Sequence, residues 1–194
     1  MKNLIDEIKK IVALSKQDEE LIKSNYHIEK YTKKQIIENH GTKYNNLYFV
    51  KNGCIQLCLI NNKGIEQTIQ FSIKGWWLTD FDSFNYEKQS FYQLKAISNT
   101  EVYKFSRTNL NTLRIEIPEL ERYFRIVAER AYSAALYRIS LMMNMSKEQR
   151  YFNYINNFPK FAKNVPQYIL ASYLGLSPEY LSEIRNKNTN IKPA

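Results

Sequence analysis

The sequence predicts an α+β fold in which an N-terminal antiparallel β-roll is followed by one long helix and then by a pair of short helices. Three observations carry this prediction. Residues 35–105 alternate runs of β-branched and aromatic residues with Asn/Gly turns, a pattern typical of antiparallel sheets. From Pro118, about thirty residues without glycine or internal proline have apolar positions at helical spacing. Farther along the chain, Gly175 separates two short apolar-periodic segments, and the second of them starts with Ser177-Pro178.

Residues 1–20 predict an amphipathic helix, because acidic and basic side chains are scattered among the apolar ones. They contain no apolar core of a secretory signal, and no stretch of the chain approaches the roughly 18 consecutive apolar residues of a membrane span. The two cysteines, Cys54 and Cys58, would lie about 13 Å apart on one strand, which is too far for a disulfide. We therefore expect a cytoplasmic protein that binds no membrane.

The strands of the roll are expected in runs rich in Val, Ile, Leu, Phe and Tyr. The turn "NNKG" separates two of these runs, and Asn52-Gly53 ends another. Short strands joined by such turns are typical of an antiparallel barrel or roll. The expected strands are residues 45–53, 54–60, 65–73, 91–98 and 100–105.

Residues 119–146 are expected to form a helix about 40 Å long at 1.5 Å per residue. Pro118 stands at the tolerated start, and Glu119 and Glu121 place negative charge in the favourable first turn. The helix could pack on its own roll or pair with a second copy of the chain. We favour pairing, because the apolar stripe outruns one small domain and is interrupted only by Arg138. The expected dimer-helix residues are Leu120, Phe124, Val127, Ala131, Ala135 and Met142.

Residues 167–187 fit the spacing of a helix-turn-helix, in which two short helices cross at a small residue. Ala171 occupies the crossing position, and Gly175 occupies the turn position that requires a positive φ. Ser177 fits the N-cap of the second helix and Pro178 fits its first turn. A helical hairpin without a DNA function fits the same packing positions, so this alternative stays open. The expected DNA-binding residues are Gln167, Ser177, Pro178, Glu179, Tyr180, Ser182, Glu183, Arg185 and Lys187.

The formal charge of +9 at pH 7 favours an anionic partner, although a lysine-rich solubilising surface would give the same charge. The excess of basic over acidic residues is denser at the C-terminal end, where residues 147–194 contain seven Lys/Arg and three Asp/Glu. A two-fold dimer would present its two second helices to successive major grooves about 34 Å apart. The sequence therefore predicts binding to double-stranded DNA that carries an approximate inverted repeat.

Two segments resemble the catabolite-activator (Crp/Fnr) family of bacterial transcription regulators. "ENHGTKYNNLYFVKNGCIQL" is similar to the family's glycine-punctuated roll, and "SKEQRYFNYINNFPKFAKNVPQYILASYLGLSPEYLSEIR" is similar to the C-terminal domain of a subgroup common in Bacteroidetes. The resemblance implies a cyclic-nucleotide-binding-like jelly roll as sensor at residues 1–118, a dimerisation helix at 119–146 and a winged helix-turn-helix DNA-binding domain at 147–194. It also implies a homodimer whose partners are DNA and RNA polymerase.

The chain departs from the nucleotide-binding members of this family at the positions that hold the nucleotide. No arginine stands where their guanidinium binds the phosphate. We therefore expect an unidentified effector, or none, rather than cyclic AMP or cyclic GMP. We expect Trp76 and Trp77 to pack in the core or against the long helix. The residues that correspond to the family's effector pocket are Thr79, Asp80, Phe81, Ser90 and Phe91.

A second departure lies in the recognition helix. Glu183 stands where family members often have an arginine that reads guanine, and a carboxylate can instead accept a hydrogen bond from the amino group of cytosine. Glu179 matches a family glutamate of that type, and Arg185 and Lys187 remain as phosphate or base partners. The operator is therefore expected to differ from the usual one of the family.

Other kinds of site lack the residues that they need. The histidines are His27 and His40, too few and too far apart for a metal site, and two cysteines cannot hold an iron–sulfur cluster. No phosphate-cradling loop or catalytic triad stands out. We expect no cofactor and no enzymatic activity. The prediction is a DNA-binding transcription regulator, and two alternatives stay open: a small-molecule sensor or protein-interaction module with a non-functional DNA-binding half, and a ligand-free regulator controlled by its abundance.

Overall fold

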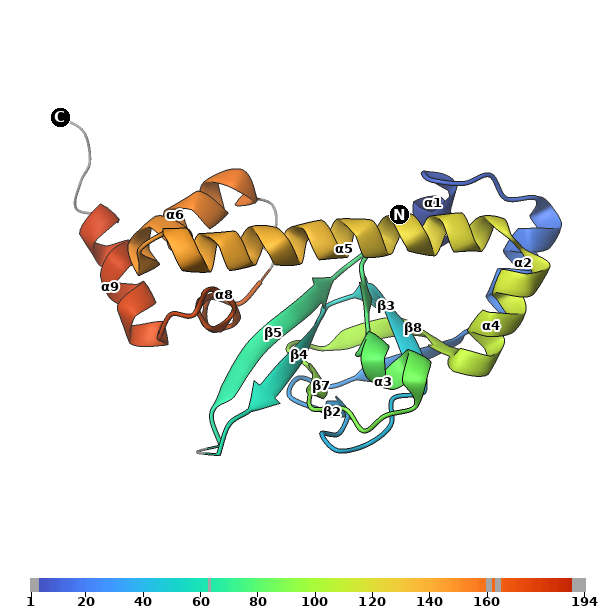
Figure 1. Cartoon of the computed structure of the whole chain (residues 1–194), viewed down its shortest axis with the longest axis horizontal. Coiled ribbons are helices and arrows are strands. Elements are labelled where there is room, and N and C mark those ends of the chain that lie inside the picture. Colours follow the sequence, from blue (N-terminus) through green and yellow to red (C-terminus); the bar gives the residue numbers. More distant parts are fainter. Residues whose placement is uncertain (1–3, 63, 160–161, 163–164, 190–194) are drawn as a thin grey trace.

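The computed structural model shows a β-roll beside one long helix, with smaller helices near both ends of that helix (Figure 1). The antiparallel sheets and the helices confirm the predicted α+β class. Within the part of the chain that is described, each helix is too short or too polar to span a bilayer. The structure describes residues 4–62, 64–159, 162 and 165–189.

The roll is built from short strands. They are β1 (His27–Tyr31), β2 (Ile36–Glu38), β3 (Asn46–Asn52), β4 (Cys54–Ile60), β5 (Glu66–Ile73), β6 (Trp77–Leu78), β7 (Gln93–Ala96) and β8 (Thr100–Ser106). They form two four-stranded antiparallel sheets, with strand orders β1-β8-β3-β6 and β2-β7-β4-β5. Side chains of both sheets fill the interior, among them Tyr48 of β3, Ile55 of β4 and Leu94 of β7. The sequence predicts strands at the positions of β3, β4, β5, β7 and β8, and these are confirmed; β1, β2 and β6 are additional.

The hairpin of β4 and β5 contains one bulge. Its register slips between the pairs Leu57–Gln70 and Cys58–Thr68, so Ile69 is an extra residue on β5. A bulge bends the strand and turns its backbone groups away from the regular ladder. Because β5 is also the edge strand of its sheet, its outer side has no neighbouring strand among the described residues.

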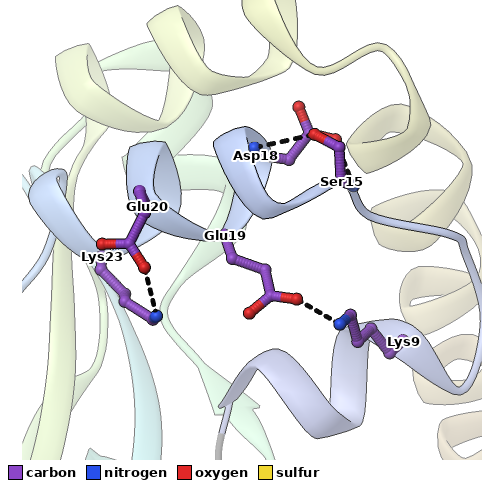
Figure 2. A network of polar contacts seen from close by, with 6 residues as sticks. All are labelled: Lys9, Ser15, Asp18, Glu19, Glu20 and Lys23. Carbon is purple, nitrogen blue, oxygen red and sulfur yellow. Dashed lines mark hydrogen bonds and ion pairs between the residues drawn. The ribbon is translucent and has the colours of Figure 1, made fainter.

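The N-terminal segment forms two helices, α1 (Leu4–Lys9) and α2 (Lys16–Ser24), where the sequence predicts one. The hydroxyl of Ser15 accepts the backbone N–H of Asp18 at 3.1 Å, and the Ser15 N–H donates to the Asp18 carboxylate at 2.8 Å. Such a capping box starts a new helix instead of continuing the old one. Figure 2 shows this cap beside an ion pair of Lys9 and Glu19, which joins the two helices.

Helix α5 (Glu119–Asn144) begins directly after Pro118, as predicted, and follows a helix that the sequence pattern does not reveal, α4 (Arg107–Glu116). The indole N–H of Trp77 donates to the hydroxyl of Tyr123 at 2.8 Å, and the rings of Trp77 and Phe124 lie 5.2 Å apart. The predicted packing against the long helix is therefore confirmed for Trp77, whereas it is wrong for Trp76, which is 48% exposed. Leu120 and Phe124 are only 2% and 8% exposed. They pack inside their own chain, which corrects the prediction that they face a partner.

The C-terminal helices pack around a core of their own at the far end of α5 (Figure 1). They are α6 (Lys147–Asn157), α8 (Gln167–Leu174) and α9 (Pro178–Thr189). Helix α8 also touches the roll, because Tyr173 stacks edge-on against Phe71 of β5 with centroids 5.0 Å apart. The predicted wing falls beyond α9, where residues 190–194 lie outside those described. The core is made of Tyr151, Tyr154, Ala162, Leu170, Ala171, Leu174, Leu176, Leu181 and Ile184.

Candidate nucleic-acid interface

The turn between α8 and α9 has the conformation that the sequence predicts. Gly175 has φ +69° and ψ +34°, which is the left-handed region. Its N–H donates to the carbonyl of Ser172 at 3.2 Å, and the N–H of Leu176 donates to that of Ala171 at 2.9 Å. These two bonds satisfy carbonyls that the end of α8 leaves unpaired. A Cβ at position 175 would lie 3.2 Å from the terminal methyl of Met142, so glycine also leaves room for α5.

The start of α9 is capped by Ser177, as predicted. Its hydroxyl accepts the backbone N–H of Tyr180 at 3.2 Å. Glu179 lies in the first turn, where its own backbone N–H and the hydroxyl of Ser177 lower the pKa of its carboxyl group. A negative charge there is favourable, because it faces the positive end of the helix dipole. The cap therefore fixes where α9 begins.

The outer face of α9 is turned to solvent. Leu181 and Ile184 are each 2% exposed and pack toward α8, so the opposite face carries the polar side chains. Tyr180 is half-buried, and the ammonium of Lys147 lies 5.6 Å from the centroid of its ring. The exposed residues on this face are Ser177, Pro178, Glu179, Ser182, Glu183 and Arg185.

The other two predicted DNA-binding residues are Gln167 and Lys187. Gln167, at the start of α8, is half-buried, and its side-chain carbonyl oxygen is buried without a hydrogen-bond partner among the described residues. Lys187 belongs to α9, but its side chain lies outside the described residues.

The predicted effector residues separate into two groups. Asp80 caps α3 (Phe81–Tyr86) by accepting the N–H of Asp82 at 3.1 Å, and it also accepts the hydroxyl of Ser90 at 2.7 Å. Thr79 donates to the carbonyl of Asn46 at 2.8 Å. These three predicted residues are buried, and their polar atoms bind other parts of the same chain. Phe81 and Phe91 are instead 43% and 72% exposed, so the structure does not bring them into the same cluster.

The interior of the roll is filled by tyrosines that the sequence analysis does not single out. Tyr44 donates its hydroxyl to the carbonyl of Tyr92 at 2.7 Å, and Tyr48 donates to the carboxylate of Glu38 at 2.7 Å. Burial raises the pKa of both phenols, so they stay protonated donors at neutral pH. Their signal in the sequence is the run "YNNLY", which places two large aromatic rings four residues apart at the entry to β3.

Two surface hollows lie elsewhere. One of about 360 Å³ is bounded by residues such as Lys30 and Glu101 on the roll. Another of about 750 Å³ lies where α5 meets α6, near Ser146 and Phe152. None of the predicted effector residues lines either hollow.

The exposed apolar stripe of α5 differs from the predicted one. In the predicted set, Val127 and Met142 are half-buried, whereas Ala131 and Ala135 are exposed. At about 100° per residue, the larger exposed residues lie roughly a third of a turn around the helix from that set. They are Tyr132, Leu136, Ile139 and Met143, with exposed fractions of 66%, 47%, 51% and 79%.

The roll matches a known protein family. Residues 28–116 match the family described as "Cyclic nucleotide-binding domain". A curated relative, the anaerobic regulatory protein of Pasteurella multocida (strain Pm70), is 25% identical over 164 residues. The match covers 78% of this chain and 59% of that protein, so the chain spans about three fifths of the relative's length.

Solved structures share the fold at low sequence identity. FixK2 of Bradyrhizobium japonicum has a TM-score of 0.73 at 16% identity over 85% of both chains. The relatives of this chain are regulators of the Crp/Fnr family. The Crp/Fnr resemblance is thus confirmed, and the Bacteroidetes-type subgroup stays a prediction. CLP of Xanthomonas campestris, a c-di-GMP responsive global regulator, has a TM-score of 0.70 at 16% identity over 91% of this chain and 92% of its own. The Thermus thermophilus catabolite activator protein has a TM-score of 0.59 at 18% identity over 95% and 87%.

Proposed function

We propose that the chain is a DNA-binding transcription regulator of the Crp/Fnr type that acts as a homodimer on an inverted repeat. The observation that carries this proposal is the unit of α8, the Gly175 turn and α9. Its inner face is closed by Leu181 and Ile184, while its outer face stays exposed. The regulatory role of the relatives supports the same function.

The exposed side chains of α9 have the chemistry to read base edges. Arg185 can donate to guanine or to a phosphate, and Glu183 can accept from the amino group of cytosine. Glu179 in the first turn is suited to the same acceptor role. Lys147 of α6 lies beside Tyr180 and brings a cation to the edge of this surface. The operator would therefore combine cytosine contacts with phosphate contacts.

A second copy would pack along α5. The exposed residues Tyr132, Leu136, Ile139 and Met143 follow one another at spacings of four, three and four, which is the seam of a two-stranded coiled coil. We name these four residues the α5 seam. It replaces the predicted stripe as the dimer contact, because Leu120 and Phe124 lie in the core of their own chain. Two copies joined there would direct two α9 helices toward one side of a duplex.

The roll is proposed as the sensor domain (residues 1–118), with 119–146 as the dimerisation helix and 147–194 as the DNA-binding domain. Its interior supports an effector other than cyclic AMP or none. Tyr44 and Tyr48 are 0% and 1% exposed and fill the centre, while Asp80 is engaged by Ser90. Contact with RNA polymerase and a cytoplasmic location belong to the same proposal.

Binding to duplex DNA tests this function. Sites would be selected from a randomised duplex library with the full chain, and affinity would be measured by fluorescence anisotropy at several salt concentrations. Arg185→Ala should weaken binding to the selected site by roughly 5- to 150-fold, since one base or phosphate contact contributes about 1–3 kcal/mol. The matched control is Arg122→Ala, an exposed arginine near the start of α5.

Thermal unfolding of both variants checks that the fold is kept. Weak binding that is equal for all sequences, and unchanged by Arg185→Ala, would contradict the proposal. That result would favour the alternative of a sensor or interaction module with a non-functional DNA-binding half.

A further inference from the structure

The outer edge of β5 is occupied by groups from the C-terminal half of the chain. The bulge at Ile69 turns backbone groups of β5 away from β4, toward the side where the described part of the chain adds no further strand to the sheet. Unpaired backbone groups that lose water are costly, so a buried edge needs partners. Thr68, next to the bulge, is 0% exposed. The partners are Arg138 of α5 and Ser172 of α8, which follow Ile69 and Thr68 by about seventy and one hundred residues.

Arg138 of α5 is the first of these partners. Its Nη1 donates to the carbonyl of Ile69 at 2.7 Å, and its Nη2 donates to the carbonyl of Thr68 at 3.2 Å. Its Nε donates to the carbonyl of Tyr173 at 2.8 Å, and the guanidinium carbon lies 4.2 Å from the centroid of that ring. One planar side chain therefore joins three elements: α5, the bulge of β5 and the last turn of α8. A cation is favourable at that end of a helix.

Ser172 of α8 is the second partner. Its hydroxyl oxygen accepts the backbone N–H of Thr68 at 2.8 Å. The hydroxyl of Thr68 in turn accepts the side-chain amide of Gln56 at 2.7 Å. The N–H, the carbonyl and the hydroxyl of Thr68 are thus each bound by a different residue. Thr68 links the sheet to both helices.

An apolar contact surrounds these polar bonds. Cys54, Phe71 and Ile97 of the roll form one buried cluster with Val165 and Ile169, which lie before and within α8. The contact excludes water from the bonds at Thr68, which strengthens them. Its polar groups are nevertheless incompletely matched. Arg138 binds neutral carbonyls, and the side-chain oxygen of Gln56 is buried without a partner among the described residues. Packing α8 against β5 through such groups therefore stabilises the closed arrangement less than a purely apolar contact would.

We propose that Arg138 and Ser172 clasp α8 to the bulged edge of β5, so that the β4–β5 hairpin sets the orientation of α9. Arg138 is a positioning residue in this arrangement, because it touches the roll and α8 and not the outer face of α9. The clasp is a conformational device. A change in the shape of the hairpin moves the carbonyls of Thr68 and Ile69, and α8 and α9 move with them. Its effect on DNA rests on the proposed function; its effect on the packing of α8 does not.

Amide hydrogen exchange of the full chain tests the clasp without DNA. In Arg138→Gln the partner of the Thr68 N–H, Ser172, is still present. If Arg138 holds α8 on the edge, this amide should exchange at least about tenfold faster than in the unaltered protein. Arg138→Lys keeps the charge but not the planar fork, and should give an intermediate rate. The matched control is Arg130→Gln, an exposed arginine on the same helix that should leave the rate unchanged.

Affinity for a series of half-site spacings then tests the consequence. Sites would be selected with the unaltered protein, and duplexes with one base pair added or removed between the half-sites would be compared. Arg138→Gln should bind the selected spacing about tenfold more weakly and discriminate less between spacings, because a released α9 samples several orientations. If the unaltered protein bound no DNA sequence specifically, the proposed function would be contradicted. The hydrogen-exchange test of the clasp would remain valid, because it does not involve DNA. Unchanged exchange at Thr68 in Arg138→Gln, or tighter DNA binding by that variant, would overturn the clasp.

Discussion

The two halves of α5 have the same helical geometry but different surroundings. In the first half, Leu120, Tyr123 and Phe124 pack into the core of their own roll. In the second half, Tyr132, Leu136 and Ile139 are exposed, and Arg138 instead reaches the edge of β5. One continuous helix therefore stabilises the roll along its first half and leaves apolar side chains exposed along its second half. Apolar spacing alone does not separate the two roles, because a core and an interface follow the same helical period.

The largest effect is expected in the buried half. Phe124→Ala removes a ring that packs on Trp77 and Tyr123 and beneath the guanidinium of Arg114. We expect the free energy of unfolding to fall by about 3–5 kcal/mol, from lost burial and the cavity left behind. Urea unfolding measures this change, at protein concentrations too low for dimerisation.

The matched control for Phe124→Ala is Tyr132→Ala in the exposed half. It should change the unfolding free energy of the monomer by no more than about 0.5 kcal/mol. Equal losses of unfolding free energy in Phe124→Ala and Tyr132→Ala would contradict the distinction between the two halves of α5.

A smaller effect is expected for the α5 seam. Leu136→Asp places a charge at the centre of the proposed dimer contact, and two-fold symmetry places it there twice. The dissociation constant of the dimer should rise at least about thirtyfold, which corresponds to roughly 2 kcal/mol, while unfolding of the monomer changes little. Sedimentation equilibrium measures the dissociation constant.

Two further variants sharpen the seam experiment. Leu136→Met keeps an apolar side chain and should keep the dimer. Ser133→Asp adds the same charge about 60° around the helix from Leu136 and about 90° from the centre of the seam, and should have a smaller effect. A dimer that withstands Leu136→Asp would place the contact on another surface.

The smallest effect is expected where the exposed half meets the turn. Gly175→Ala should lower the unfolding free energy by about 1–2 kcal/mol, because alanine disfavours φ +69°. The new Cβ would also press on the methyl of Met142 at 3.2 Å. Gly64→Ala is the control: its φ is +72°, and nothing lies within 4 Å of the new atom. Thermal unfolding should show a loss for both variants, slightly larger at Gly175. No loss at Gly175 would contradict the left-handed turn.

The sequence predicts correctly those helices and strands whose local pattern is strong. The Asn/Gly turns locate the central strands, Pro118 locates the start of α5, and Gly175 with Ser177-Pro178 locates the turn before α9. It fails where the pattern is weak or misleading. Strand β1 is largely exposed and β6 is two residues long, so neither shows an alternation. The cap at Ser15 divides a segment whose charges look like one helix.

The candidate site is predicted less completely than the fold. The exposed face of α9 follows from helical spacing, since buried Leu181 and Ile184 define its opposite side. The effector residues were transferred from the family pattern, and only Thr79, Asp80 and Ser90 are buried together. Arg138 looks like an interruption of an apolar stripe. Its acceptors are backbone carbonyls about seventy residues away, and no side-chain pattern marks a carbonyl.

The bulge in β5 makes the contact with α8 sensitive to a change in the length of this strand. Removing Ile69 would give β4 and β5 a regular register, yet it would also remove the Ile69 carbonyl, one of the two β5 carbonyls that bind Arg138. A single codon lost from this hairpin would therefore weaken the proposed clasp between the roll and α8, without altering Arg138 or Ser172.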